Sequence, residues 1–138
     1  MIRHRQPLRR GTVTVEFALC APILFVFTFA SFEFSRVNSL RQTAENAVYE
    51  GCRRGIVPGA TTGDVQAATT LVLDSVFTQN PTVTITPSVI TEDTSTVTVS
   101  VAVPLDDNAW VIPRFFSARE LTSSLTMARE RGLNSSVD

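Results

Sequence analysis

Residues 9–17 of the chain read Arg9-Arg10-Gly11-Thr12-Val13-Thr14-Val15-Glu16-Phe17, and an apolar run follows them. From Phe17 to Phe32 this run has sixteen residues and no charged side chain. With its flanking residues it reaches about 23 residues, and a membrane-spanning helix needs roughly 20. The pattern therefore predicts a transmembrane helix over residues 12–35, in which neighbouring helices can tolerate a kink at Pro22.

The charges on either side of the apolar run are unequal. Residues 1–11 carry four arginines and no acid, whereas the rest of the chain carries eight arginines against thirteen acidic residues. The positive-inside rule places residues 1–11 in the cytoplasm, as a basic leader, and residues 36–138 outside the cytoplasmic membrane. An acidic exported part does not suit a nucleic-acid binder, whose positive charge would lie on the folded domain.

A secretory signal peptide is the competing interpretation of the apolar run. Thr28-Phe29-Ala30 is a weak candidate for its small-residue cleavage site. Signal peptides have apolar regions of about 7–15 residues, however, and this run is longer and opens with a carboxylate. A permanent or processed membrane span is therefore favoured.

Glu16 stands where the apolar run begins, and a carboxylate at the edge of the hydrocarbon costs free energy unless it stays wet or has a partner. Cleavage after Gly11 would create a positive α-amine at Thr12, four residues before Glu16. That spacing allows a contact within one helix, or a pair between staggered neighbours that fixes their register. Glu33, at the opposite edge, is expected to reach water.

These residues resemble the prepilin-peptidase site of type IV pilin-like proteins, in which a glycine, four residues and a glutamate open an apolar helix. The longer pattern resembles the TadE-like pseudopilins of tight-adherence (Flp/Tad) systems. The residues that carry this resemblance most specifically are Arg9-Arg10-Gly11, Val15-Glu16-Phe17-Ala18-Leu19, Pro22 and Glu33-Phe34. Weaker similarity continues through Ala47, Gly51-Cys52-Arg53, Gly55, Val97–Pro104 and Leu125-Thr126-Met127-Ala128-Arg129.

The resemblance implies that a membrane aspartyl peptidase cuts between Gly11 and Thr12. It also implies that Glu16 and Phe17 act in assembly and register. The protein would then be a minor pilin-like subunit in the inner membrane, or in a surface fibre. Its partners would be sister pilins and pseudopilins of the same system and the prepilin peptidase.

Beyond the membrane the same helix is expected to continue to Arg54, because apolar residues recur at three- and four-residue steps. A helix over residues 13–54 would be roughly 63 Å long at about 1.5 Å per residue. Asp64 is expected to cap a second helix that ends near Asn80-Pro81. The apolar face expected for this second helix consists of Val65, Ala68, Leu71, Val72 and Val76.

Period-two patterns follow the second helix. They predict strands at residues 82–86 and 96–103, separated by a turn at residues 92–95. Residues 118–129 fit a last strand, although their composition also permits a helix. Together the elements predict an α+β head over residues 36–131, with the long helix packed on a small antiparallel sheet as in pilins, and a flexible tail at 132–138.

Few side chains are of the types that form catalytic sites, metal sites or disulfides. The one histidine, His4, lies in the basic leader, so hydrolytic and zinc sites are not expected, and no cofactor or metal is predicted. Cys20 and Cys52 lie roughly 48 Å apart on a continuous helix, which excludes an intrachain disulfide. Cys52 could bridge two copies, but a small, partly buried thiol is the favoured interpretation.

The loop between the last two predicted strands allows more than one interpretation. Asp106, Asp107 and Asn108 could offer oxygen ligands to calcium, but they lack the alternate spacing of calcium loops, and a solvated turn is favoured. The apolar residues after them either fold onto the core or form a docking patch for another subunit or the membrane face. That patch consists of Trp110, Ile112, Phe115 and Phe116.

Two functions from different classes fit the sequence. The first is a structural subunit for assembly of a pilus-like fibre or secretion apparatus. The second is an uncleaved, single-pass, membrane-anchored binding module of the cell envelope. An enzyme is not expected, because the sequence lacks a nucleophile–base pair, a phosphate-binding glycine loop and a ligand cluster.

Overall fold

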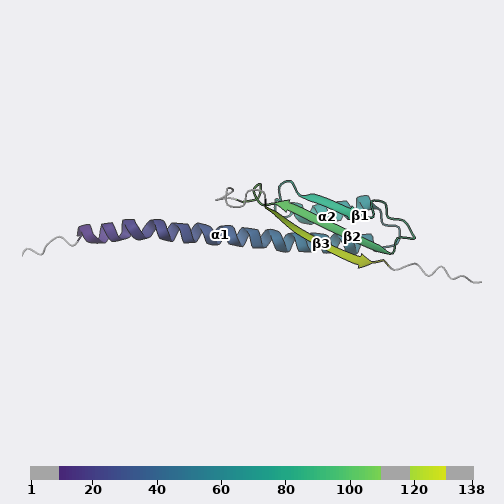
Figure 1. Ribbon diagram of the computed structural model, residues 1–138, viewed down its shortest axis with the longest axis horizontal. Helices are drawn as coiled ribbons and strands as arrows, with labels where there is room; N and C mark the ends of the chain where they lie inside the picture. Colours follow the sequence, from purple (N-terminus) through teal and green to yellow (C-terminus); the bar gives the residue numbers. More distant parts are fainter. Residues whose placement is uncertain (1–9, 110–118, 130–138) are drawn as a thin grey trace, which may run out of the picture.

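The computed structural model describes residues 10–109 and 119–129, and it has the expected α+β arrangement (Figure 1). One long helix, α1, extends well beyond a head in which a second helix and a three-stranded sheet pack against its C-terminal half (Figure 1). The chain order is α1, α2, β1, β2, β3. The molecule therefore consists of a bare rod and a two-layer head that share one continuous helix.

Helix α1 spans Arg10–Gly55, three residues earlier and one residue later than expected. It continues through Pro22 without interruption. Its buried positions in the head follow helical steps, and most carry small side chains: Leu40, Thr43, Ala44, Ala47, Val48, Gly51, Cys52 and Gly55. Small residues on this stripe let the other layers approach the helix closely.

Helix α2 spans Thr62–Asp74, and its cap corrects the sequence prediction by three residues. The N-cap is Thr61, whose side chain accepts from the Asp64 backbone N–H, while the Asp64 carboxylate accepts from the Thr61 backbone N–H. This is a capping box, in which Asp64 occupies the third position of the helix rather than the cap. The sequence prediction correctly placed Asp64 in the first turn of the helix, but it missed Thr61, three residues earlier, as the N-cap.

The buried face of α2 matches the expected one only in part: Val65 is buried as expected and Val72 packs against the core, but other members differ. Val65, Thr69 and Leu73 are buried, one turn apart, whereas Leu71 is 74% exposed. Residues at i, i+4 and i+8 share a face, and hydrophobicity alone did not identify Thr69 as a member of it. The Thr69 hydroxyl donates to the Val65 carbonyl at 2.8 Å, which satisfies it inside the core.

The sheet is antiparallel with the order β1-β2-β3. Strand β1 spans Thr82–Thr86 as expected, β2 spans Thr96–Pro104, and β3 spans Glu120–Ala128, so the last segment is a strand and not a helix. Central strand β2 buries Val97, Val99, Val101 and Val103 completely against the helices. The predicted alternation of this strand is thus confirmed, and its valines form the centre of the head's core with the small residues of α1.

Candidate functional site

The predicted processing bond lies in the first turn of α1. Gly11 and Thr12 are both exposed, and nothing lies within 4 Å of the place where a side chain on Gly11 would begin. The first turn of a helix has backbone N–H groups without helical partners, so it opens more easily than the interior. No other described part of the chain shields this bond from a peptidase.

Glu16 lies one turn beyond Thr12 and is exposed. Along a helix, residues four apart lie on one face, with a rise of about 6 Å between them. A new α-amine at Thr12 would therefore be on the same face as the Glu16 carboxylate. Phe17, the next residue, is 71% exposed, so both predicted assembly residues are open to a neighbouring chain or to lipid.

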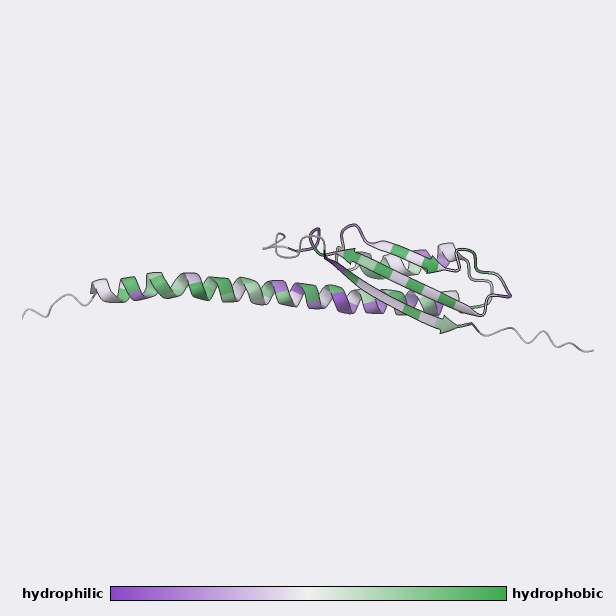
Figure 2. Cartoon of the chain, in the orientation of Figure 1, coloured by the Kyte–Doolittle hydropathy of each residue, from purple (hydrophilic) through white to green (hydrophobic). Residues whose placement is uncertain are grey.

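The rod that follows is apolar and bare (Figure 2). Helix α1 is long and apolar enough to cross a membrane, and no residue of its most apolar 18-residue stretch is buried within the chain. Hydroxyl groups in this region are satisfied internally: Thr28 donates to the Leu24 carbonyl and Ser31 to the Phe27 carbonyl, each at 2.8 Å. Internal satisfaction of hydroxyl groups is what a lipid environment requires.

The junction between rod and head is polar and closed, which corrects one prediction. Glu33 is only 4% exposed, so its carboxylate does not lie open to water at the edge of the span. One turn later, Arg36 donates from Nη1 and Nη2 to the Val76 carbonyl at 3.2 and 3.3 Å. Glu33 begins the same stripe that continues at Leu40 and Ala44, and this spacing was the signal for its burial.

A second junction residue was assigned the wrong role from sequence. Asn108 is buried rather than solvated: its Oδ1 accepts from the Gln79 N–H at 2.8 Å, and its Nδ2 donates to the carbonyls of Gln79 and Pro104. The neighbouring Asp107 carboxylate accepts from the Asn80 side chain at 2.9 Å. These oxygens are engaged in fixing two loops. Among the described residues, no group of three His, Cys, Asp or Glu is placed to hold a metal.

Cys52 is a buried thiol, as favoured from the sequence. It is fully buried, and its Sγ donates to the Leu125 carbonyl at 3.2 Å. Burial raises the pKa of the Cys52 thiol, and a backbone hydrogen bond at Val99 only partly offsets that effect. A bridge between two copies through Cys52 would require the head to open.

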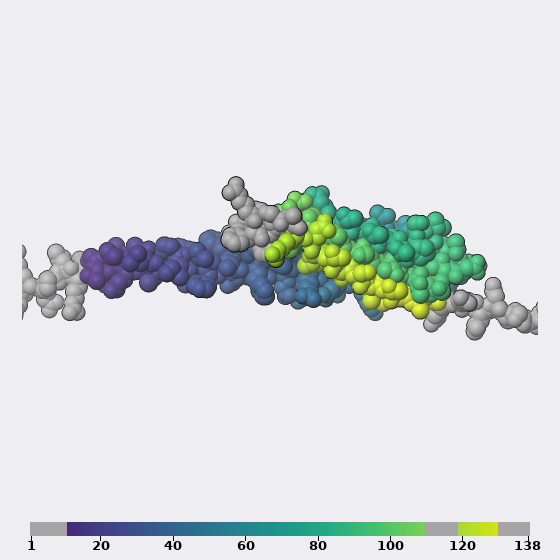
Figure 3. Space-filling view, in the orientation of Figure 1, coloured from purple at the N-terminus to yellow at the C-terminus, as the bar shows by residue number. Residues whose placement is uncertain are grey.

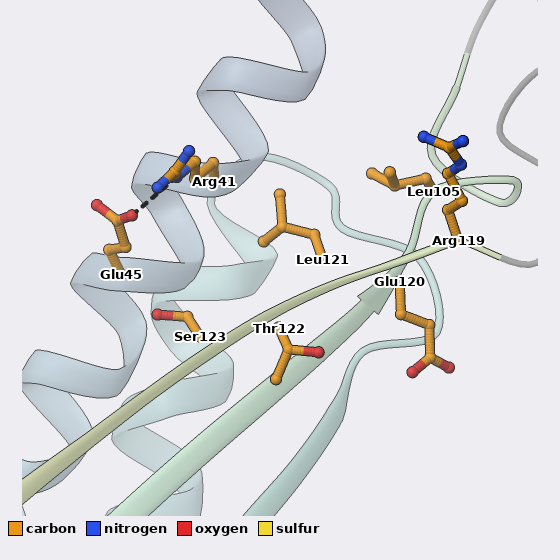
Figure 4. A pocket seen from close by; sticks show the side chains of 8 residues that line it. All are labelled: Arg41, Glu45, Leu105, Arg119, Glu120, Leu121, Thr122 and Ser123. Atoms are coloured by element: carbon orange, nitrogen blue, oxygen red, sulfur yellow. Dashed lines mark hydrogen bonds and ion pairs between the residues drawn. The ribbon is translucent and has the colours of Figure 1, made fainter.

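A groove of ≈ 440 Å³ lies between α1 and β3 (Figure 4). Arg41 and Glu45 face each other on its helix side, with Nε and Oε1 3.1 Å apart. The side chains of Arg119 and Glu120 lie at its other end (Figure 4). The groove is open and of mixed charge, and its lining contains no nucleophile paired with a base.

The predicted docking patch of Trp110, Ile112, Phe115 and Phe116 lies outside the described residues. So do the basic leader over residues 1–9 and the tail over 132–138. The expected docking patch, basic leader and flexible tail therefore stay predictions. The described part of the site therefore consists of Gly11, Thr12, Glu16 and Phe17 at the start of a bare apolar rod.

Comparison with known proteins gives one match. Residues 11–53 match the family model described as TadE-like protein. No curated protein and no solved structure matches the chain. The match begins at the predicted processing glycine and ends two residues before the end of α1, so it covers the rod and the helix stripe that supports the head.

Proposed function

We propose that this chain, TadE-like over residues 11–53, is a minor pilin-like membrane subunit that helps to assemble a Flp/Tad-type adhesive pilus or secretion apparatus. Its bare apolar helix, with an exposed glutamate near the start, is the observation that carries the proposal. A helix that stays outside its own head needs lipid or other helices as its environment. The family match supports a pilus-associated, structural role rather than catalysis.

We further propose that a prepilin peptidase cuts between Gly11 and Thr12. The exposure of both residues and the empty space around Gly11 support access to the bond. After cleavage, the Thr12 amine and the Glu16 carboxylate would be one turn apart. Pairing Glu16 with the amine of a neighbouring subunit would remove the cost of a lone charge near the hydrocarbon and set the stagger between helices.

In this proposal the chain is a single-pass protein of the inner membrane. The excess of arginine in residues 1–11 supports a cytoplasmic N-terminus, with the head on the opposite side. Sister pilins and pseudopilins would pack against the rod, and the head would rise above the membrane surface. Incorporation into a surface fibre would follow extraction of the rod from the bilayer.

The first test is the intact mass of the protein purified from membranes of a strain that carries the cognate peptidase. We expect a species that begins at Thr12, and full-length protein from the Gly11→Ala variant. Full-length wild-type protein in the presence of active peptidase would instead favour the uncleaved, membrane-anchored binding module. A species that begins near Ser31 would identify the apolar run as a signal peptide.

The second test isolates the role of the carboxylate. Glu16→Gln should insert in the membrane normally but co-isolate less with sister pilins. Glu45→Gln is the matched control, because Glu45 lies on an exposed face of the same helix within the head. Unchanged co-isolation of Glu16→Gln would contradict the pairing.

A further inference from the structure

Phe77 holds a backbone conformation that an aromatic residue rarely adopts. After α2, the Thr78 N–H donates to the Leu73 carbonyl at 3.3 Å and the Phe77 N–H donates to the Asp74 carbonyl at 3.0 Å. These two bonds form a Schellman motif, in which the residue at the position of Phe77 is usually glycine because its φ is positive. Phe77 has a φ of 56°, so its side chain occupies a site where glycine would be less strained.

Burial of the Phe77 ring in the head does not offset this backbone strain. It is 80% exposed, the largest exposed fraction among the large hydrophobic residues of the described chain. A strained backbone and an exposed ring are two separate costs at one residue. Together they indicate that the ring has its partner outside this chain.

The distribution of phenylalanine supports the same conclusion. All seven phenylalanines that the structure describes are exposed, and six of them lie on the rod, from Phe17 to Phe34. The described core is built from valine, alanine, leucine and Cys52 instead. Phe77 is the single phenylalanine that the structure describes in the head, where Tyr49, at 53%, is also exposed but less so.

The position of Phe77 along the molecular axis identifies the partner. Helix α2 runs antiparallel to α1, because Gly55 lies beside Val65, Gly51 beside Thr69, and Arg36 beside Val76. The double hydrogen bond from Arg36 to the Val76 carbonyl holds the residue before Phe77 at the level of Arg36. Arg36 lies two residues after Phe34, which is the last exposed aromatic residue of the rod. Because Phe77 is at the level of Arg36, it lies where α1 leaves the apolar region.

We infer that Phe77 inserts into the interfacial layer of the bilayer from which α1 emerges, and so sets the head against the membrane surface. Aromatic side chains are enriched at this level because the ring stays among lipid chains and headgroups. A pocket of ≈ 350 Å³ beside Phe77 has Arg36, Gln79 and Asp107 in its lining, polar side chains that suit the headgroup layer. The inference rests on the membrane anchor of the proposed function, and its occupant is lipid rather than another protein.

Arg36 has a positioning role in this arrangement. Its guanidinium fixes the loop that carries Phe77 relative to α1, so the ring and the rod enter the membrane as one unit. The head would then be attached to the membrane at two points, the α1 span and the Phe77 ring. Two points of attachment would limit the rotation of the head about the span. Contact of the ring with lipid would also be released when the rod leaves the bilayer for a fibre.

The test uses tryptophan fluorescence of the full chain in vesicles of phosphatidylcholine and phosphatidylglycerol. Trp110, the one native tryptophan, is first changed to phenylalanine. Three single tryptophans are then compared: Phe27→Trp in the rod, Phe77→Trp, and Val89→Trp. Val89 is also exposed, at 67% against 80% for Phe77. It lies near the opposite end of α2, because the carbonyl of the preceding residue, Ser88, accepts from the Thr62 hydroxyl. Part of the phosphatidylcholine carries bromine near the glycerol end of its acyl chains, which quenches nearby indole rings.

We expect quenching at Phe77→Trp to reach at least about half of that at Phe27→Trp, with a blue-shifted emission, because interfacial tryptophan sits at headgroup level. Val89→Trp should remain unquenched. If Phe27→Trp is quenched and Phe77→Trp behaves like Val89→Trp, the inference is wrong while the membrane anchor stands. If Phe27→Trp is also unquenched, the anchor itself fails.

The Phe77→Gly variant gives a second, independent readout in detergent micelles. Glycine adopts the positive φ without strain, so the melting temperature of the head should stay the same or rise. A fall of several degrees would show that the ring stabilises the head internally, which would overturn the inference.

Discussion

The two halves of α1 show how one helix serves two environments. The lower half, residues 11–34, carries many bulky side chains, and nearly all of its residues are exposed, whereas the upper half has a buried stripe of mostly small side chains. Leu24 is 67% exposed and Leu40 is 1% exposed, although both are leucines in the same uninterrupted helix. The space-filling view shows the same division, a narrow rod that broadens only where the head begins (Figure 3).

This difference teaches that the packing partners of each half, rather than residue type alone, decide which side chains are buried: small residues predominate on the packed stripe, but leucine is found in both halves. Alanine and glycine on the upper stripe bring α2 and the sheet close to the helix axis. Phenylalanines on the lower half offer large areas to lipid or to neighbouring helices. A truncation in the upper half of α1 should therefore destabilise the head, whereas the same truncation in the lower half should not.

The largest expected effect comes from making the same truncation in both halves. Leu40→Ala should destabilise the head by about 2–5 kcal/mol, because it removes a fully buried side chain and leaves a cavity. Leu24→Ala should change the unfolding of the head by less than about 0.5 kcal/mol, as is usual for exposed sites. Chemical unfolding of the detergent-solubilised protein, followed by circular dichroism, measures both. Equal losses would contradict the division of the helix.

The two cysteines sharpen the same comparison, since one lies in each half of α1. In detergent, the rate at which N-ethylmaleimide labels Cys20 should be the same whether the head is folded or unfolded, because Cys20 lies outside the head. Labelling of Cys52 should be at least about a hundredfold slower than in the unfolded chain, because the reagent must wait for the head to open. The raised pKa of Cys52 lowers its thiolate fraction further. Cys20→Ser and Cys52→Ala variants assign the two reactions, and rapid native labelling of Cys52 would show that the head is loose.

Gly51 tests the close approach of the upper half to α2. A Cβ at this position would lie 2.2 Å from Thr69 Oγ1, so Gly51→Ala forces the helices apart. We expect a net loss of about 1–2 kcal/mol, because overpacking costs more than the helix propensity that alanine contributes.

Gly63→Ala is the matched control for this substitution, since its nearest neighbour, Thr61 Oγ1, is at an ordinary 3.6 Å. It should stabilise the head slightly. The double variant Gly51→Ala, Thr69→Ala should recover much of the loss. Thermal melts of the four proteins measure these differences, and an unaffected Gly51→Ala would show that the layers are not in tight contact.

Much of this fold was predictable because its patterns are local. Strand β1 was placed at its observed bounds, and the alternating valines of β2 identified the buried face correctly. Two predictions for α2 were wrong: its end was expected near Asn80-Pro81 but lies at Asp74, and Leu71 is exposed. Other errors occurred where a polar residue is buried by tertiary contacts. Thr69 belongs to the buried face of α2 because Gly51 leaves room for it, and no property of α2 alone predicts that neighbour.

The residues of the candidate site were named from their sequence motif, and their role stays a prediction; the surroundings of the rod could not be predicted in the same way. Gly11, Thr12 and Glu16 are recognised by spacing, since they lie on consecutive turns of one exposed helix. Arg36 and Asn108 were harder, because their hydrogen bonds are with loops that meet them only after folding, and the burial of Glu33 was missed as well. The stripe that continues from Glu33 to Leu40 was a signal for burial, but a charge on an apolar stripe is usually assigned to solvent.

The smallest expected effect concerns Asp64, which secures the start of α2 against the upper half of α1. The Thr61 backbone N–H and hydroxyl donate to its carboxylate at 3.0 and 2.7 Å, and with a smaller contribution from Arg54 they lower the pKa of Asp64 below 3.8. A carboxyl whose pKa is lowered by folding stabilises the head above its unfolded pKa. This contribution is lost as the pH falls through the lower, folded value.

The melting temperature of wild type should therefore fall below about pH 4 more steeply than that of Asp64→Asn, since only the carboxyl gains a proton there. The two proteins should converge at the lowest pH that leaves the head folded. Thr61→Val should flatten the profile in the same way, because it removes one of the donors. Thr62→Val is the control: its hydroxyl donates to Ser88 and not to Asp64, so it should lower stability without changing the slope. Parallel profiles for wild type and Asp64→Asn would mean that the capping box does not hold in solution.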